Sequence, residues 1–160
     1  MSEEEIYLEI WHYLTDLFSC PVIQGLQNNS PMPKNCVVMT LLPYTKDLDQ
    51  SQYYNENGES MIQVSRQYMM QLDFYGDEAP DRALKCASLW RSRYSTDKLK
   101  GVQPLYANDA RNMEFINEQD QYEKRFLVEI ALQYNPHYTY SEQSDILADL
   151  DIKLITTRED

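Results

Sequence analysis

Hydrophobic side chains recur at three- and four-residue steps near the start of the chain, over residues 3–18. This period predicts an amphipathic helix. Its apolar positions are Ile6, Ile10, Tyr13, Leu14, Leu17 and Phe18. Ser2 is suited to cap this helix, and the three acidic residues at 3–5 lie where the positive end of the helix dipole favours them.

After a polar loop, expected at about residues 24–35, the pattern changes to that of strands. Residues 36–42, CVVMTLL, predict a short buried strand that ends at Pro43, because proline cannot donate to a strand ladder. Residues 61–76 alternate between apolar and polar side chains. Between the two, a hairpin tip is expected at about residues 52–60, where Asn57-Gly58 is a strong tight-turn signal.

A second helix is predicted after Gly76, because Asp77 and Pro80 are typical of a helix start. Its expected apolar stripe consists of Ala83, Leu84, Ala87, Trp90 and Tyr94. A short strand is expected at about residues 102–106, and another at about residues 150–157.

Residues 121–135 alternate again and predict a long strand. Fully extended, they would span roughly 50 Å. A domain of this size has a diameter of roughly 40 Å, so the strand would have to bend or project beyond its own core. The alternative is two strands separated by a bulge near Arg125.

The order of elements, helix, strands, helix, strands, lacks a regular βαβ alternation. It predicts an α+β fold: an antiparallel or mixed β-sheet with long strands, packed by an N-terminal helix and a central helix. With 160 residues, the chain is expected to form a single domain over 1–160.

Charge narrows the possible partners. The formal net charge of -12 disfavours sequence-independent binding of nucleic acid, and no specific nucleic-acid binding is expected. No apolar run approaches the length that crosses a bilayer, and the N-terminus has no signal-peptide pattern, so no membrane contact and a cytoplasmic site of folding are expected. The odd number of widely spaced cysteines, Cys20, Cys36 and Cys86, favours reduced thiols.

Patterns of catalysis are not found in the sequence. The four glycines form no phosphate-binding loop, and the two histidines lack metal-ligand spacing to each other or to a cysteine. We therefore expect no catalytic, cofactor-binding or metal site. The 13 tyrosines instead suit either protein–protein surfaces or half-buried strand faces.

Three segments together resemble the neck or tail-terminator proteins of tailed bacteriophages. They are FINEQDQYEKRFLVEIALQYN, RQYMMQLDFYGDEAPDRALKCASLW and DILADLDIKL, and their order covers nearly the whole chain. The resemblance implies a non-enzymatic virion protein that is made in the host cytoplasm and needs no cofactor. It also implies a ring, commonly a hexamer, that caps the tail tube and joins it to the head-side connector protein. The implied partners are therefore other copies of the chain, the tail-tube protein and the connector.

A closed ring requires one surface patch to meet a different patch on the next copy. The residues expected at this subunit interface are Arg66, Asn117, Glu118, Gln119, Tyr122, Glu123 and Arg125. Glu123 with Arg125, or Arg66 with a neighbouring acid, is expected to pair across subunits. A related hypothesis is that acidic side chains at the ring lumen repel passing DNA.

Two alternatives remain at this point. The chain could be another phage morphogenesis protein, of the head-completion or tail-tube type, which would stack into tubes. It could instead be a monomeric binding module or a small enzyme, for which a deep pocket lined by His12, His137 or clustered acids would be the sign.

Overall fold

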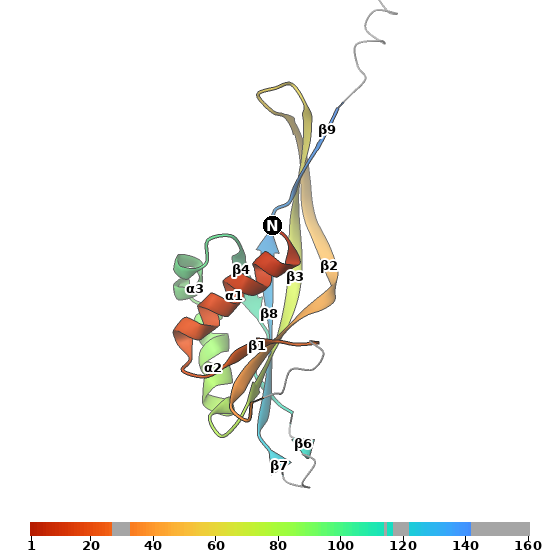
Figure 1. Cartoon of the computed structure of the whole chain (residues 1–160). Helices are drawn as coiled ribbons and strands as arrows, with labels where there is room; N and C mark the ends of the chain where they lie inside the picture. The colour runs from red at the N-terminus through yellow and green to blue at the C-terminus, as the bar shows by residue number, and fades with distance from the viewer. Residues whose placement is uncertain (27–32, 114, 117–121, 142–160) are drawn as a thin grey trace, which may run out of the picture.

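A computed structural model of the chain describes residues 1–26, 33–113, 115–116 and 122–141 (Figure 1). Its elements, in chain order, are α1 (Glu3–Leu17), β1 (Val22–Gln24), β2 (Cys36–Tyr54), β3 (Ser60–Tyr75), α2 (Ala79–Trp90), α3 (Arg93–Lys98), β4 (Gln103–Ala107), β5 (Arg111–Asn112), β6 (Phe115–Ile116), β7 (Tyr122–Glu123), β8 (Arg125–Tyr134) and β9 (His137–Tyr140). The predicted strand at residues 150–157 and most of the predicted polar loop lie outside the described residues.

The fold is α+β, as predicted. A mixed sheet runs in the order β1-β2-β3-β8-β4, with β5 also pairing with β8 and β9 also pairing with β3. Only β1 and β2 pair in parallel; the other described pairs of this sheet are antiparallel. The three helices lie on one side of the sheet in Figure 1.

Helix α1 begins as the sequence predicts. The Ser2 side chain accepts a hydrogen bond from the Glu5 backbone, and the Glu5 side chain accepts one from the Ser2 backbone, which completes a capping box. Five of the six expected apolar positions are buried, Ile6, Ile10, Tyr13, Leu14 and Phe18, and the sixth, Leu17, is half-buried. The helix is therefore held by its apolar stripe on the sheet.

The sheet supplies the other half of this core from alternate positions of its two central strands. These positions are Met70, Leu72 and Phe74 on β3 and Val128, Ile130 and Leu132 on β8, all 0% exposed. Trp90 at the end of α2 fills the space above β8, and its indole N–H donates to the carbonyl of Ala131 at 3.2 Å. The buried ring is thus both packed and hydrogen-bonded.

The predicted central helix becomes two. Helix α2 ends at Trp90, and Ser92 caps the short helix α3, which contains Tyr94. Of the predicted stripe, Leu84 is 56% exposed, while Cys86, which the stripe omitted, is fully buried. The predicted positions Ala83, Ala87 and Trp90 are buried, so the stripe on α2 is confirmed except that Cys86 takes the place of Leu84. No described helix is long and apolar enough to cross a membrane.

The prediction that the first strand ends at Pro43 is wrong. Strand β2 continues from Cys36 to Tyr54, with register shifts between Leu41 and Thr45 and between Asp47 and Asp49. Pro43 is tolerated because it lies in the first irregularity, where the ladder is interrupted, and because β1 covers β2 only at Val37–Met39. The hairpin tip is close to its predicted place, with Gly58 at φ 77°.

The prediction of one long strand over residues 121–135 is also wrong. Strands β7 and β8 are separated at Lys124, which matches the alternative of a break near Arg125. The long projecting elements are instead β2 and β3, with 19 and 16 residues, which rise beyond the helices in Figure 1. At about 3.3 Å per residue, β2 spans roughly 60 Å.

Candidate functional site

The part of the sheet beyond the helix layer is a three-stranded ribbon, which we call the arm. It consists of residues 45–54 of β2, residues 60–66 of β3, and β9. All ten residues 45–54 are exposed. Of the apolar side chains of the arm, Val64 is buried, at 3% exposed, but Tyr53 and Tyr54 remain exposed, so the arm is a surface on which a partner can dock.

One face of the arm carries a group of tyrosines. Ser60 pairs with Tyr54 on one side and Tyr140 on the other, and Ile62 pairs with Tyr138. Cross-strand partners share a sheet face. The three rings therefore lie together, and they are 66%, 48% and 39% exposed for Tyr54, Tyr138 and Tyr140.

Two of these rings are held by hydrogen bonds from the arm itself. The Gln52 amide donates to the hydroxyl of Tyr140, and Arg66 Nη1 donates to the hydroxyl of Tyr138 at 3.1 Å. Rings fixed in this way lose little side-chain entropy when a partner covers them. The face is suited to protein–protein contact, because tyrosine combines a large apolar area with a polar group.

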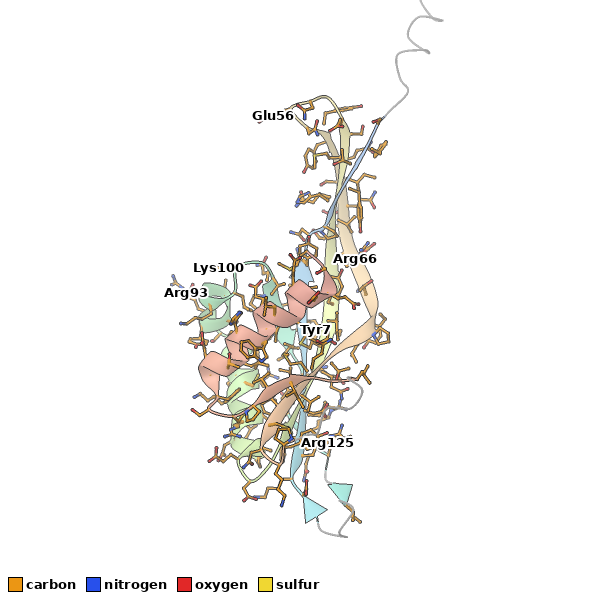
Figure 2. The ribbon with its side chains drawn as sticks, in the orientation of Figure 1. Tyr7, Glu56, Arg66, Arg93, Lys100 and Arg125 are labelled. Atoms are coloured by element: carbon orange, nitrogen blue, oxygen red, sulfur yellow. The ribbon has the colours of Figure 1, made fainter. Side chains whose placement is uncertain are left out.

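Arg66 is the centre of this arrangement (Figure 2). Its Nε donates to Asp47 Oδ1 at 2.6 Å across the β2–β3 pair. The hydrogen bond from Arg66 lowers the pKa of the Asp47 carboxyl, and the bonds to Asp47 and Tyr138 raise the pKa of Arg66. The expected interface residue Arg66 is therefore already paired with an acid of its own chain.

Arg125 lies at the other end of the sheet. It pairs with Tyr75 at the end of β3, nine residues from Arg66, so the two arginines are roughly 30 Å apart along the strand. Its Nη2 donates to Asp73 Oδ1 at 2.7 Å, and its guanidinium lies 5.7 Å from the centre of the Tyr75 ring. Partial burial acts to lower the pKa of Arg125, but the hydrogen bond and charge of Asp73 outweigh it and leave that pKa raised.

The acid that Arg125 holds is buried, with its side chain 6% exposed. A second donor, Gln71 Nε2, reaches Asp73 Oδ2 at 2.9 Å. Such a carboxylate needs both partners, because a buried charge without them costs several kcal/mol. This ion pair therefore has a structural role within the chain.

The remaining expected interface residues are divided by the structure. Asn117, Glu118 and Gln119 lie outside the described residues. Tyr122 and Glu123 form β7, which pairs with β6 apart from the main sheet. We still only predict that these five residues, together with Arg66 and Arg125, lie at a subunit interface. Tyr122 and Glu123 precede Arg125 by three and two residues in the chain. Arg66 lies at the other end of the β3–β8 pairing.

Sequence reasoning missed Asp47 and the tyrosines of the arm. The strand was expected to end at Pro43, so residues 45–51 were not assigned to a strand, and no strand was predicted at residues 137–140. The available signal was the hairpin turn at Asn57-Gly58, which requires two strands of similar length on either side.

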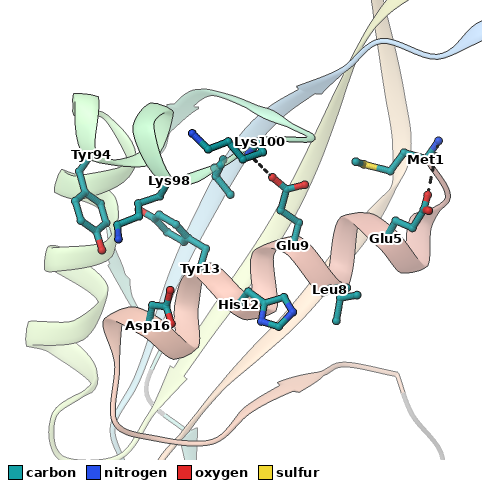
Figure 3. A pocket seen from close by; sticks show the side chains of 11 residues that line it. Met1, Glu5, Leu8, Glu9, His12, Tyr13, Asp16, Tyr94, Lys98 and Lys100 are labelled. Atoms are coloured by element: carbon teal, nitrogen blue, oxygen red, sulfur yellow. Dashed lines mark hydrogen bonds and ion pairs between the residues drawn. The ribbon is translucent and has the colours of Figure 1, made fainter.

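A pocket of about 380 Å³ lies between α1 and α3 (Figure 3). It contains His12, with Glu9 and Lys100 on its wall. The Glu9 carboxylate accepts hydrogen bonds from the backbone N–H groups of Lys100 and Gly101 at 2.6 and 2.7 Å. Glu9 thus fixes the loop after α3 to α1, so its carboxylate has a structural role.

The described residues contain no group of three or more histidine, cysteine or acidic side chains placed to hold a metal ion. Their cysteines are free thiols. Burial raises the pKa of Cys86 to about 12 and is the main cause that raises the pKa of Cys36 to about 11. These two thiols are therefore protonated at neutral pH and suited to packing.

Comparison with known proteins adds one match. The model of a family described as phage neck terminator protein matches residues 4–158. The match covers both helices that form the core, the whole arm and most of the residues that follow it. No curated protein matches the chain.

Proposed function

The chain belongs to the family of phage neck terminator proteins, and on this premise we propose that its copies assemble into a ring, commonly a hexamer, at the end of the tail. In this proposal the ring caps the tail tube and joins it to the head-side connector protein. The protein acts by binding and not by catalysis. Its partners are other copies of itself, the tail-tube protein and the connector, and its place of assembly is the host cytoplasm.

The observation that supports this proposal best is the arm. It extends beyond the helix layer and carries three exposed tyrosines on one face, two of them held by Gln52 and Arg66. An exposed ribbon of this kind is a liability for a protein that works as a monomer, because open strand edges and apolar rings promote association. In a ring the neighbouring copy covers them.

Ring closure also needs a second patch that differs from the first. The arm and the region around Arg125 lie at opposite ends of β3 and therefore fulfil this geometric requirement. In a head-to-tail arrangement, the arm of one copy would contact the body of the next. Contacts between identical patches would give dimers instead.

The experiment that tests this function is light scattering behind size-exclusion chromatography, with negative-stain imaging, at several protein concentrations and with or without purified tail tubes. Discrete rings of one size support the proposal. Open tubes would favour the tail-tube alternative. A chain that remains monomeric in solution and does not bind tail tubes contradicts the proposal.

The role of the arm is tested by Tyr54→Ser, with Tyr44→Ser as the matched control. Both tyrosines belong to β2 and are similarly exposed, at 66% and 59%, but Tyr44 precedes the arm. We expect Tyr54→Ser to reduce ring formation and Tyr44→Ser to leave it unchanged. Rings that form equally well with both variants would contradict a role for the tyrosine face.

A further inference from the structure

A groove of about 450 Å³ lies between α1 and β1. Its lining is mainly apolar and includes Ile23, Leu8 and Trp11, of which Leu8 and Trp11 are 54% and 38% exposed. The Trp11 indole N–H donates to the carbonyl of Val22 at 2.9 Å, so the ring is fixed against β1. Exposed apolar side chains on a preorganised groove mark a surface on which a partner docks.

The groove lies toward one edge of the sheet. In the described part of the chain, β1 is the end of the strand order β1-β2-β3-β8-β4 and pairs only with β2. Helix α1 contacts β1, whereas α2 contacts β3, β8 and β4, and α3 contacts β4. The groove and the pair of helices α2 and α3 therefore lie toward opposite edges of the sheet.

Charge is divided between these two edges. Residues 1–26, which contain α1 and β1, have five acidic residues and no lysine or arginine, and we call them the acidic edge. Residues 82–100, which contain most of α2 and all of α3, have six basic residues and one acidic residue, and we call them the basic edge. In a chain with a formal net charge of -12, the basic edge is an exception. The two edges attract each other when one copy meets another.

The charges of the two edges do not neutralise each other within one copy. Among the described side chains, no ion pair joins the acidic edge to the basic edge. Glu3 and Glu4 on α1 and Lys85 on α2 are exposed and have no ion-pair partner in the described part of the chain. These three charges are therefore available to a second copy.

The basic edge also presents an apolar side chain that suits the groove. Leu84 on α2 is 56% exposed. Ser88 and Arg91, four and seven residues later, are exposed on the same side of this helix, and Lys85 is exposed beside it. An exposed leucine between cations is the complement of an apolar groove beside acids. A helix that places such a side chain in a groove is a recurrent mode of protein recognition.

Two unlike patches at opposite edges of one subunit produce a head-to-tail contact. The acidic edge of one copy meets the basic edge of the next, and each copy keeps one patch for each neighbour. Such a contact closes into a ring when the rotation between copies allows it. Because the sheet separates the two patches, they do not meet within one copy.

We propose that Leu84 of one copy docks in the groove between α1 and β1 of the next copy, against Leu8 and Trp11, with the basic edge facing Glu3 and Glu4. This inference rests on the self-assembly proposed above. It adds to the contact made by the arm a second contact, between the helical layers of successive copies, and it identifies both surfaces.

Charge reversal tests this contact. One variant carries Glu3→Lys and Glu4→Lys, and a second carries Lys85→Glu and Arg93→Glu. Each places like charges on both sides of the contact. We expect the protein concentration at which half of the chain is in rings to rise about tenfold for each, measured by light scattering and imaging. A third variant with all four changes again places opposite charges against each other, so its ring formation should return.

A general effect of net charge predicts a different order. The variant with Glu3→Lys and Glu4→Lys is less negative than the wild type, so it would assemble more readily if net charge alone mattered. Unchanged ring formation in both twofold variants would overturn the inference. So would a fourfold variant that is folded, with a thermal midpoint near that of the wild type, and forms no more rings than the twofold variants.

Disulfide trapping is a second test that leaves these charges unchanged. In a Cys20→Ser background, one copy carries Leu8→Cys and an affinity tag, and the other carries Leu84→Cys. The control replaces Leu84→Cys by Leu48→Cys, because Leu48 is also exposed, at 44%, but belongs to the arm. Cross-linked pairs are measured on non-reducing gels.

We expect Leu8→Cys to cross-link about tenfold more with Leu84→Cys than with Leu48→Cys, because docking holds the two thiols at an effective concentration near millimolar. Equal yields would overturn the inference. Equal yields are also the result expected if another ligand, such as a segment of the same chain, occupies the groove.

Failure of this inference is separable from failure of the proposed ring. If imaging finds rings of the wild-type chain but Leu8→Cys gives no excess cross-linking with Leu84→Cys, the ring proposal stands and the copies meet through other surfaces. If the wild-type chain remains monomeric and does not bind tail tubes, the proposed function fails, and this inference fails with it.

Discussion

Arg66 on β3 and Asp47 on β2 form a bidentate ion pair across the base of the arm, with Nε–Oδ1 and Nη2–Oδ2 distances of 2.6 and 3.3 Å. The pair lies directly beside the register shift between Asp47 and Asp49, where β2 has one residue more than β3. The same guanidinium donates to Tyr138 on β9. One side chain thus connects all three strands of the arm.

Replacement of Arg66 by glutamine should alter assembly more than stability. The side chains of Arg66 and Asp47 are 23% and 52% exposed, and an exposed ion pair contributes little to stability because solvent screens it. The Tyr138 ring, however, loses the donor that holds it. We expect a thermal midpoint close to that of the wild type and weaker ring formation, measured by calorimetry and light scattering. A large fall in the thermal midpoint would contradict the expectation that Arg66 contributes mainly to assembly.

Replacement of Arg125 by glutamine should have the opposite effect. It leaves the buried carboxylate of Asp73 without its charged partner, and breaking such a pair costs about 3–5 kcal/mol. Urea denaturation of the variant measures this loss. The double variant Arg125→Gln, Asp73→Asn removes both charges and should be more stable than the sum of the two single effects predicts. Additive effects would show that the two side chains do not interact.

This stability effect changes how a charge reversal at Arg125 is interpreted. Arg125→Glu brings a second carboxylate beside Asp73, so any loss of assembly could result from unfolding. An assembly test at Arg125 therefore requires the unfolding free energy of the same variant. Arg66→Gln, which leaves the core intact, separates assembly from stability better.

Two glycines provide a matched test of backbone strain. Gly76 has φ 108° and a Cβ at this position would overlap the Asn35 side chain, whereas Gly58 has φ 77° and open space around it. Gly58→Ala should cost about 1–2 kcal/mol, the usual penalty of a positive φ. Gly76→Ala should cost more, because steric overlap is added. Urea denaturation of both variants checks the order, and a smaller loss at Gly76 would contradict it.

The three cysteines should differ in reactivity. Cys36 and Cys86 are 1% and 0% exposed, whereas Cys20 is partly exposed. Thiolates react and buried protonated thiols do not. We expect an aromatic disulfide reagent at pH 8 to modify Cys20 first, and Cys36 and Cys86 only at the rate of unfolding. Rapid reaction of three thiols in the folded chain would contradict the burial described here.

The raised pKa of Cys86 also predicts a loss of stability at alkaline pH. Above the ordinary thiol pKa of 9 the unfolded chain ionises, while the folded chain keeps the proton until about pH 12. The folded state then binds more protons, so its stability falls as pH rises across this window. The contribution is at most about 1.4 kcal/mol per pH unit. Cys86→Ala should reduce the slope of unfolding free energy against pH between 9 and 10.5; an unchanged slope would contradict the prediction.

Local sequence patterns correctly predicted two features that depend on nearby residues, helix α1 and the core face of β3. The three- and four-residue spacing at Ile6, Ile10 and Leu14 was sufficient for α1, and Ser2 with Glu5 defined its start. The alternation through Met70, Leu72 and Phe74 identified the core face of β3. These signals are reliable because each depends on residues a few positions apart and on one buried face.

The sequence by itself therefore determined the α+β class, the helices' buried faces, the hairpin turn and the resemblance to neck terminators. Only the tertiary structure decided that β2 continues past Pro43, because a proline is tolerated where no neighbouring strand and no regular ladder requires its N–H. Only the tertiary structure paired Arg66 with Asp47 and Arg125 with Asp73. Strand register determines these contacts between residues 19 and 52 positions apart, and register depends on the packing of the whole sheet.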